Sequence, residues 1–241
     1  MYAIDQLEKI LFIDIETVSL VANFENLPER YKPLWEKKSV YLSQDKAATP
    51  TTTFFDKAAI YAEFGKVIVI GLGFFYTDKQ GKLAFRSKSI QGHDEKVVLE
   101  EFKELVDKKF GTLTHKLCAH NGKEFDYPYL CRRMVINGIT LPKILKISDK
   151  KPWEVPHYDT LDMWKFGDKK AYTSLELLAT VLDIPTSKDG IDGSMVNDTY
   201  YNKQDLNKIA KYCKNDVVVT AQIFLRLTGH QILPQGQINI V

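Results

Sequence analysis

The sequence is poor in cysteine, lacks a long apolar run and has almost no excess charge. Its three cysteines, Cys118, Cys131 and Cys213, show no paired spacing, which argues against a disulfide framework or a zinc site. We therefore expect free thiols in a reducing compartment. The N-terminus lacks the basic and apolar regions of a signal peptide, and the longest apolar run, Val67 to Tyr76, is too short to span a bilayer. These absences favour a soluble cytoplasmic protein with no membrane partner.

The balance of charges limits the kind of partner. A formal net charge of +2 is too small to indicate a broad basic surface for nucleic acid. Any contact with a polyanion must therefore be local, or be made through metal ions. The apolar share of 44% and the charged share of 27% are ordinary for a globular protein. The length of 241 residues favours one domain over 1–241.

The apolar pattern predicts strands interspersed with helices. The clearest strand is the run 66–77, which we expect to be covered on both faces. Gly71 and Gly73 inside it indicate a bulge or close packing, because neither the third glycine nor the helix of a nucleotide-binding loop follows. An irregular segment at about 18–60 is predicted to be an insertion with short helices, one of them capped by Thr53. The order indicates an α/β fold with a mixed five-stranded sheet flanked by helices. The predicted strands are 9–17, 66–77, 82–87, 116–120 and 157–161, and the main predicted helices are 54–64, 93–110, 125–137, 174–182 and 203–227.

Two acids stand out in the first predicted strand, in the run LFIDIET from Leu11 to Thr17. Asp14 and Glu16 are two residues apart, so in a strand both side chains lie on one face. Two carboxylates on a buried strand repel each other unless a cation lies between them. Clustered carboxylate oxygens suit Mg²⁺ or Mn²⁺, so the run indicates a metal site. The alternative is an edge strand with two solvated acids.

Two further acids occupy places where ligands bind in α/β proteins. Asp126 ends the run HNGKEFD, in which a strand closes and a helix opens, at the sheet edge where ligands sit. The helix dipole alone also favours an acid in a first helical turn. Asp216 follows Tyr212 by four residues, so the two side chains project together from the last predicted helix. For these two, the alternative is an ordinary surface pair.

Together these segments resemble the DEDD, or DnaQ-like, superfamily of 3'-5' exonucleases. The matched positions, in the order of the three family motifs, are Asp14, Glu16, Asn121, Phe125, Asp126, Tyr212 and Asp216. In placing a tyrosine four residues before the last aspartate, the chain resembles the tyrosine (DEDDy) branch of the superfamily. The histidine branch carries a histidine one position earlier, where this chain has Lys211. Within that branch the chain resembles the proofreading exonuclease domain of family B DNA polymerases, without a polymerase attached. The resemblance extends from Lys9 to Leu227 and implies a ribonuclease H-like fold.

The resemblance also implies a mechanism and a cofactor. Two divalent ions, Mg²⁺ or Mn²⁺, would activate water and stabilise the leaving 3'-oxygen during phosphodiester hydrolysis. Asp14 would bridge both ions. Glu16 and Asp216 would complete the site of the attacking water, and Asp126 would help to hold the second ion. A phenol with a pKa near 10 is a poor base at neutral pH, so the expected role of Tyr212 is to orient the water.

Three more residues have predicted contacts with the substrate. Asn121 either hydrogen-bonds the substrate or holds its own loop. Phe125 either stacks on the terminal base or packs in the core. Lys188 lies where family B exonucleases carry a lysine two residues before an apolar one, here Ile191. It is expected either to contact a phosphate or to remain in solvent.

The region between these motifs gives weaker indications. The lysines within 143–170, with Trp153 and Tyr158 among them, form either a rim that binds a nucleic-acid strand or a solvated basic surface. Asp159 and Asp162, in the run HYDTLDMW, are expected near the site but receive no predicted role.

The leading functional prediction is a metal-dependent 3'-5' exonuclease acting on single-stranded or frayed DNA, with DNA 3' ends as its partner. One alternative keeps the chemistry and changes the substrate to RNA. Another is a non-catalytic nucleic-acid-binding module with the same fold. The presence of all five acid and tyrosine positions argues against that module.

Overall fold

A mixed sheet forms the centre of the protein. The computed structural model describes residues 2–42, 47–112, 114–168, 172–186 and 190–241. Within them, six strands pair in the order β5-β4-β1-β2-β3-β6. The antiparallel pairs are β1 with β2 and β2 with β3, and the parallel pairs are β1 with β4, β4 with β5 and β3 with β6. The strands are β1 (Ile10–Ser19), β2 (Gly65–Thr77), β3 (Leu83–Gln91), β4 (Lys116–Ala119), β5 (Tyr158–Asp159) and β6 (Ile238–Ile240).

The α/β class and the mixed sheet are confirmed, but the sheet has one strand more than the five expected. The added strand is β6, which pairs with β3 through only three residues. A run of three residues is too short to show a strand period in sequence. It becomes a strand because the chain beyond the last helix lies against the open edge of β3.

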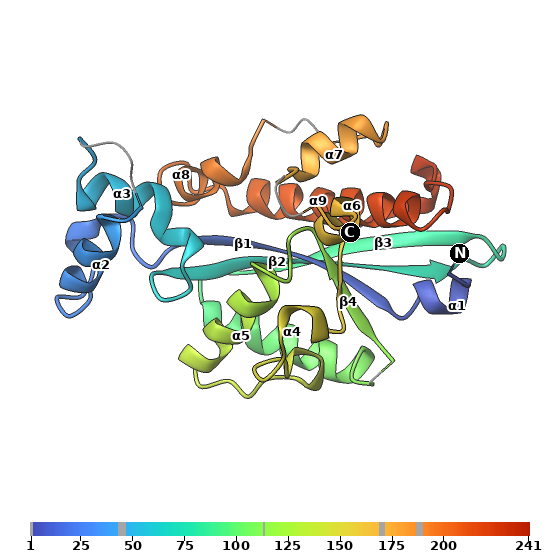
Figure 1. The fold of residues 1–241 in the computed structure, drawn as a ribbon, viewed down its shortest axis with the longest axis horizontal. Coiled ribbons are helices and arrows are strands. Elements are labelled where there is room, and N and C mark those ends of the chain that lie inside the picture. Colours follow the sequence, from blue (N-terminus) through green and yellow to red (C-terminus); the bar gives the residue numbers. More distant parts are fainter. Residues whose placement is uncertain (1, 43–46, 113, 169–171, 187–189) are drawn as a thin grey trace.

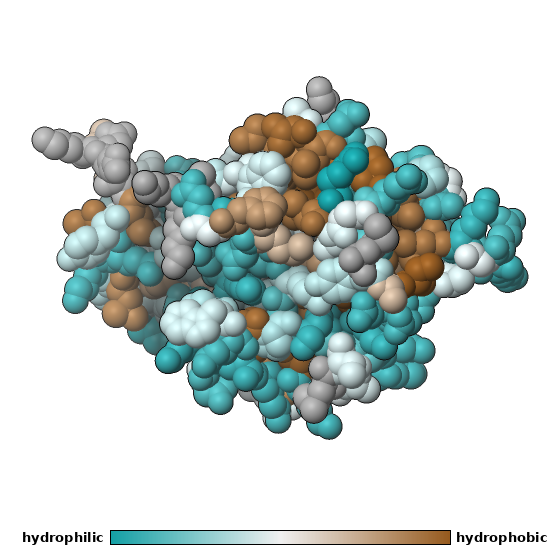
Figure 2. Space-filling model, turned by 45° about the vertical axis from the view of Figure 1, so that its right-hand side comes forward, coloured by the Kyte–Doolittle hydropathy of each residue, from teal (hydrophilic) through white to brown (hydrophobic). Residues whose placement is uncertain are grey.

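Helices cover both faces of the sheet (Figure 1). On one face lie α4 (Glu95–Lys109) and α5 (Asp126–Ile136), and on the other lies the long α9 (Leu206–Leu227). The remaining helices of the described chain are α1 (Ile4–Leu7), α2 (Lys32–Ser39), α3 (Pro50–Lys57), α6 (Thr160–Lys165), α7 (Leu175–Val181) and α8 (Val196–Tyr201). Single 3₁₀ turns are found at η1 (Phe24–Asn26), η2 (Ala58–Ile60), η3 (Lys143–Leu145), η4 (Pro152–Glu154), η5 (Gly193–Met195) and η6 (Gln235–Gln237). Figure 2 shows apolar surface gathered at the top of the molecule, where Figure 1 places α7.

The alternation of side chains along β1 divides the core into two parts. Leu11, Ile13 and Ile15 belong to the cluster that packs against α4 and α5. Phe12 points to the opposite face and stacks edge-on against Phe224 of α9, with ring centroids 5.6 Å apart. Because side chains alternate along a strand, the even-numbered residues after Phe12 also face α9.

Two glycines of β2 let α9 approach the sheet closely. Gly71 pairs with Asp14 in the β1–β2 ladder. A Cβ atom at Gly71 would lie 2.8 Å from the Cys213 sulfur and 2.8 Å from a methyl group of Val217. A Cβ atom at Gly73 would also meet Val217, at 2.6 Å. The prediction of close packing at these glycines is confirmed, and its effect is to bring α9 against the centre of β1.

The segment after β1 contains α2 and α3 and its own apolar cluster. Trp35 is fully buried there, with its ring centroid 5.2 Å from that of Phe54. The predicted cap at Thr53 is wrong, since α3 begins one turn earlier and Thr49 accepts the capping hydrogen bond from the Thr52 N–H. Pro50 sets this start, because proline fits the first helical position and lacks the N–H that would be unpaired there. That residues 18–60 form an insertion into one domain remains a proposal.

None of the helices in the described part of the chain combines the length and apolarity that crossing a bilayer requires.

Candidate active site

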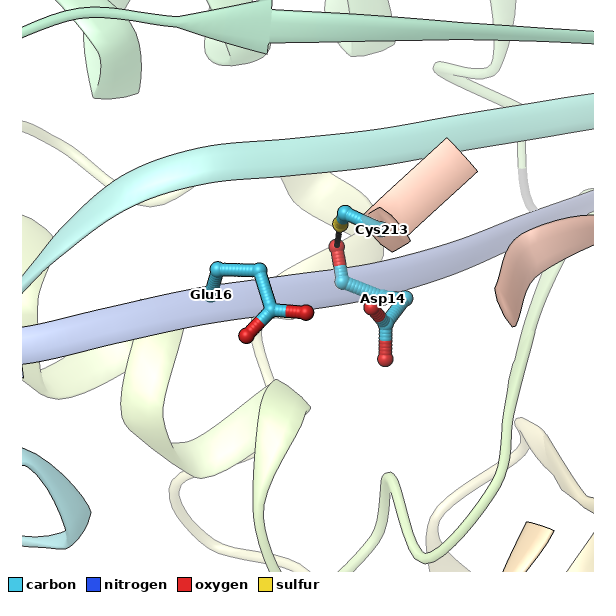
Figure 3. A group of neighbouring side chains, drawn as sticks. All are labelled: Asp14, Glu16 and Cys213. Atoms are coloured by element: carbon cyan, nitrogen blue, oxygen red, sulfur yellow. Dashed lines mark hydrogen bonds between the residues drawn. The ribbon is translucent and has the colours of Figure 1, made fainter. Parts of the chain in front are cut away.

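The two acids of β1 lie on the face of the strand that α9 covers. Their carboxylates point to the same side of the strand, and Cys213 approaches from α9 (Figure 3). One carboxylate oxygen from each of Asp14 and Glu16 and the Cys213 sulfur lie within 4.8 Å of one another. Glu16 is only 7% exposed. The edge-strand alternative is wrong, because β1 is a central strand paired on both sides.

Asp126 reaches the same point from the helix on the other side. It is the first residue of α5 and is 3% exposed. Its Oδ1 accepts a hydrogen bond from the backbone N–H of Ile15, at 3.2 Å. Ile15 lies between Asp14 and Glu16 in the chain, so this bond fixes Asp126 directly beside the acids of β1.

Tyr212 and Asp216 project together from α9, as their helical spacing predicts. The Tyr212 hydroxyl lies near enough to the Asp216 carboxylate to lower the pKa of that acid, against the larger effect of burial. On the same helix, the Cys213 thiol donates to the backbone carbonyl of Asp14, with sulfur and oxygen 3.4 Å apart (Figure 3). This bond holds the α9 residues against the centre of β1.

The charges of the four acids oppose one another. Burial raises the pKa of Asp14 well above its usual value, and the nearby Asp126 and Asp216 raise it further. Burial also raises the pKa of Glu16, followed by the charges of Asp14, Asp216 and Asp126. Burial raises the pKa of Asp126 to about 7, although hydrogen bonds from backbone N–H groups oppose the rise. The pKa of Asp216 rises to about 6, again chiefly because of burial. The cluster therefore binds protons when no cation neutralises it.

The residues present fit a divalent metal site. The Oδ2 atom of Asp14 is buried and has no hydrogen-bond partner among the described residues. A buried carboxylate oxygen without a partner is costly, and a metal ion would satisfy it. Four carboxylates supply the hard oxygen ligands that Mg²⁺ and Mn²⁺ prefer. Asp14, Glu16, Asp126 and Asp216 are thus the residues that could hold the ions.

The loop that leads into Asp126 is held by a carboxylate to which the sequence assigned no role. Asp159 is 2% exposed, and its two oxygens accept hydrogen bonds from the N–H groups of Asn121 (2.9 Å) and Lys123 (3.0 Å). The same side chain caps α6 through the Leu161 N–H. Asp159 therefore ties this loop to the start of α6.

The predicted substrate contacts have different outcomes. Asn121 has φ = 63°, a left-handed conformation that asparagine tolerates better than most residues, and its backbone takes part in holding the loop. Phe125 is half-buried and packs on Tyr129, with ring centroids 5.3 Å apart. Lys188 lies outside the described residues. A contact of any of these three with substrate remains a proposal.

One neighbour of the site was not predicted to belong to it. Cys213, which the sequence indicates only as a free thiol, is buried and also donates a hydrogen bond to the backbone carbonyl of Asp14. Its position next to Tyr212 on α9 was the available signal.

The two aromatic residues of the predicted basic rim differ in exposure. Tyr158 packs inward, with its ring centroid 5.2 Å from that of Phe224. Trp153 is 76% exposed, as a rim residue would be.

A family comparison agrees with this geometry. Residues 60–235 match the model of a family described as a predicted 3'-5' exonuclease related to the exonuclease domain of PolB. This match covers more than half of the chain. The chain belongs to this PolB-related exonuclease family. The matched region contains Asp126, Tyr212 and Asp216, whereas Asp14 and Glu16 precede it.

DNA polymerases of Pyrococcus are among the proteins that this chain resembles in sequence. DNA polymerase 1 of Pyrococcus abyssi is 25% identical over 176 residues, which are 67% of this chain and 22% of the polymerase. A DNA polymerase of Pyrococcus horikoshii is 25% identical over 177 residues, which are 67% of this chain and 14% of the polymerase. The chain thus spans less than a quarter of the length of these relatives.

The fold has a counterpart among solved structures. The family B DNA polymerase of the archaeon Pyrobaculum calidifontis superposes with a TM-score of 0.54 and 14% identity, over 90% of this chain and 24% of the polymerase. At this identity the likeness shows a shared fold. The ribonuclease H-like architecture expected from the sequence is confirmed, and the assignment to the tyrosine branch stays a prediction.

Proposed function

We propose that this protein is a metal-dependent 3'-5' exonuclease that hydrolyses phosphodiester bonds, mainly of single-stranded DNA. The observation that carries the proposal is the buried Oδ2 atom of Asp14, which has no hydrogen-bond partner among the described residues, beside three further acids of β1, α5 and α9. Such a cluster is unfavourable in an apolar core and becomes favourable when it binds cations. The archaeal relatives are DNA polymerases, which supports DNA as the substrate.

In this proposal the acidic side chains bind the metal ions on which the reaction depends. Asp14, Glu16, Asp126 and Asp216 hold two divalent ions, Mg²⁺ or Mn²⁺. When bound, such ions supply an activated water and neutralise charge on the phosphoryl and leaving oxygens. The Ile15 N–H fixes the Asp126 carboxylate, so that acid is positioned before substrate arrives.

Tyr212 positions a reactant and does not act as a base. Burial, followed by the charge of Asp216, raises its pKa well above the ordinary value, so its hydroxyl stays protonated at neutral pH. The hydroxyl lies near Asp216, and it can donate or accept a hydrogen bond with a water or a substrate group beside that acid. The free thiols of Cys118, Cys131 and Cys213 support the proposed cytoplasmic location.

A degradation assay tests the proposal. Single-stranded DNA and RNA of matched sequence, labelled at the 5' or the 3' end, are incubated with the protein in Mg²⁺, in Mn²⁺ or in EDTA. We expect mononucleotides to be released from the 3' end of DNA in the presence of metal and no release in EDTA. The expected loss in Asp14→Ala or Asp216→Ala is about a hundredfold or more. Asp149→Ala, which changes an exposed acid, is the matched control.

Several outcomes would contradict the proposal. Activity that survives EDTA excludes the metal mechanism, and near-full activity of Asp14→Ala excludes this site. Release of mononucleotides from the 5' end would show the opposite polarity of hydrolysis. Degradation of RNA and not of DNA would show that RNA is the substrate, while the metal-dependent hydrolysis would stand.

A further inference from the structure

Large aromatic side chains are exposed on the segment that links α6 to α7. Phe166, directly after α6, is 84% exposed, and Tyr172, two residues before the Ser174 that caps α7, is 69% exposed. Trp164 lies against Phe166, with ring centroids 6.4 Å apart. Unlike its neighbour, Trp164 is partly buried and packs on the apolar cluster between α7 and α9. We call Trp164, Phe166 and Tyr172 the aromatic ledge.

The aromatic ledge borders the loop that carries Asp126 into the candidate site. The His120 ring is hydrogen-bonded to the carbonyl oxygen of Thr173, at 2.9 Å, next to Tyr172. At the other end of the ledge, Asp162 of α6 forms an ion pair with Lys123 of this loop, at 3.3 Å. Asp162 and Thr173, which lie on either side of the exposed rings in the chain, are therefore both bonded to the loop that leads into Asp126.

Phe166 combines a left-handed backbone with an exposed ring. Its φ of 43° lies in the left-handed region, which costs a bulky residue free energy. Burial does not offset this cost, since most of the ring is exposed. The contact with the anchored Trp164 limits the directions in which the ring can turn. An exposed aromatic face of this kind suits planar ligands that stack.

We propose that the aromatic ledge stacks bases of the single strand upstream of its 3' end. This inference rests on the proposed nuclease function and adds the surface that guides its substrate. Every base has an aromatic face, so such a surface binds strands with little sequence preference. Lys123 of the loop and Lys165 of α6 have their ammonium groups 3.3 Å and 3.5 Å from the Asp162 carboxylate, beside the ledge, and they favour an anionic backbone there.

Binding to an oligonucleotide that cannot be cleaved tests this proposal. In full-length protein carrying Asp14→Asn, the affinity for fluorescein-labelled ten-residue oligothymidylate is measured by anisotropy at fixed ionic strength. Phe166→Asn removes the ring, and asparagine tolerates the left-handed backbone, so the variant should fold at least as stably. We expect about tenfold weaker binding in Phe166→Asn and near-parental binding in Phe166→Tyr. Tyr41→Ala, which removes an 81% exposed ring next to α2, is the matched control and should bind like the parent.

The outcomes separate this proposal from the proposed function. If Phe166→Asn and its parent bind the oligonucleotide with equal affinity, the proposed role of the ledge is contradicted, even if the wild-type protein is an active nuclease. Loss of binding in Phe166→Asn supports the ledge, even if the wild-type protein proves inactive. Self-association that Phe166→Asn abolishes, with unchanged oligonucleotide affinity, would assign the ring to a contact between two copies and overturn the proposal. Equal weakening by Tyr41→Ala would also contradict it, because the effect would then not be local.

Discussion

Replacing Asp126 with asparagine should stabilise the metal-free protein while it removes nuclease activity. Asparagine has the shape of aspartate, and its side-chain oxygen can still accept the hydrogen bond from the Ile15 N–H. It removes one negative charge from a buried cluster of four acids. The change therefore separates the contribution of Asp126 to the fold from its contribution to a metal site.

The size of the effect follows from the pKa of Asp126. This pKa rises from 3.8 to about 7 in the folded protein. Because one pKa unit corresponds to about 1.4 kcal/mol, the ionised carboxylate destabilises the fold by up to about 4 kcal/mol near pH 8. Entry of water into the metal-free site reduces this cost, so we expect a gain of about 2 kcal/mol in Asp126→Asn. For a protein of this size the gain corresponds to a rise in Tm of about 4–8 °C.

The stability gained by Asp126→Asn should depend on pH in a defined direction. A carboxyl group whose pKa is raised by folding stabilises the protein below its unfolded pKa, and that stability is lost as pH rises through the folded value. The advantage of Asp126→Asn should therefore be largest near pH 8 and should shrink as pH falls toward 4. Thermal unfolding in EDTA across this range measures it, with Asp149→Asn as the exposed control. Mg²⁺ should raise the Tm of the wild-type protein more than that of the variant.

Two results would refute this reasoning about Asp126. A variant that is less stable than the wild-type protein near pH 8 in EDTA would show that the carboxylate stabilises the metal-free fold. A gain that does not change with pH would show that charge is not its cause.

Three further predictions concern neighbouring residues. Tyr212→Phe should lower turnover about tenfold and leave Mn²⁺ affinity, measured by calorimetry, unchanged, because the hydroxyl orients a reactant; an unchanged turnover would make it a packing residue. Gly71→Ala should lower the free energy of unfolding in urea by about 1–3 kcal/mol, because the added methyl group would meet the Cys213 sulfur. Arg133→Met should cost about 3–5 kcal/mol in the same measurement, because it leaves the buried carboxylate of Glu95 without its ion-pair partner. A loss below about 1 kcal/mol in either variant would contradict these packing arguments.

Much of the site could be predicted because short-range periodicity places its side chains. Asp14 and Glu16 share a face because a strand repeats every two residues, and Tyr212 and Asp216 share one because a helix repeats about every four. The position of Asp126 followed from the strand that closes before it and the helix that it opens. In each case the local backbone fixes the direction of the side chain, and the sequence records the local backbone.

The parts that were missed depend on contacts between distant segments. Asp159 holds the loop of Asn121 across 38 residues of sequence, and nothing near Asp159 indicates that partner. The sixth strand, β6, is a strand only because β3 offers it an edge. The cap of α3 was placed at Thr53 and not at Thr49 because several threonines follow one another, and the sequence alone does not rank them.

The most direct test of the central claim is the location of Mn²⁺ in a crystal of the wild-type protein, found from anomalous scattering. We predict two peaks among the four acids, with a carboxylate oxygen of Asp14 in contact with both, and the loss of both peaks in Asp14→Ala. The absence of any peak within coordination distance of Asp14, at Mn²⁺ concentrations that support hydrolysis, would contradict the metal-dependent site.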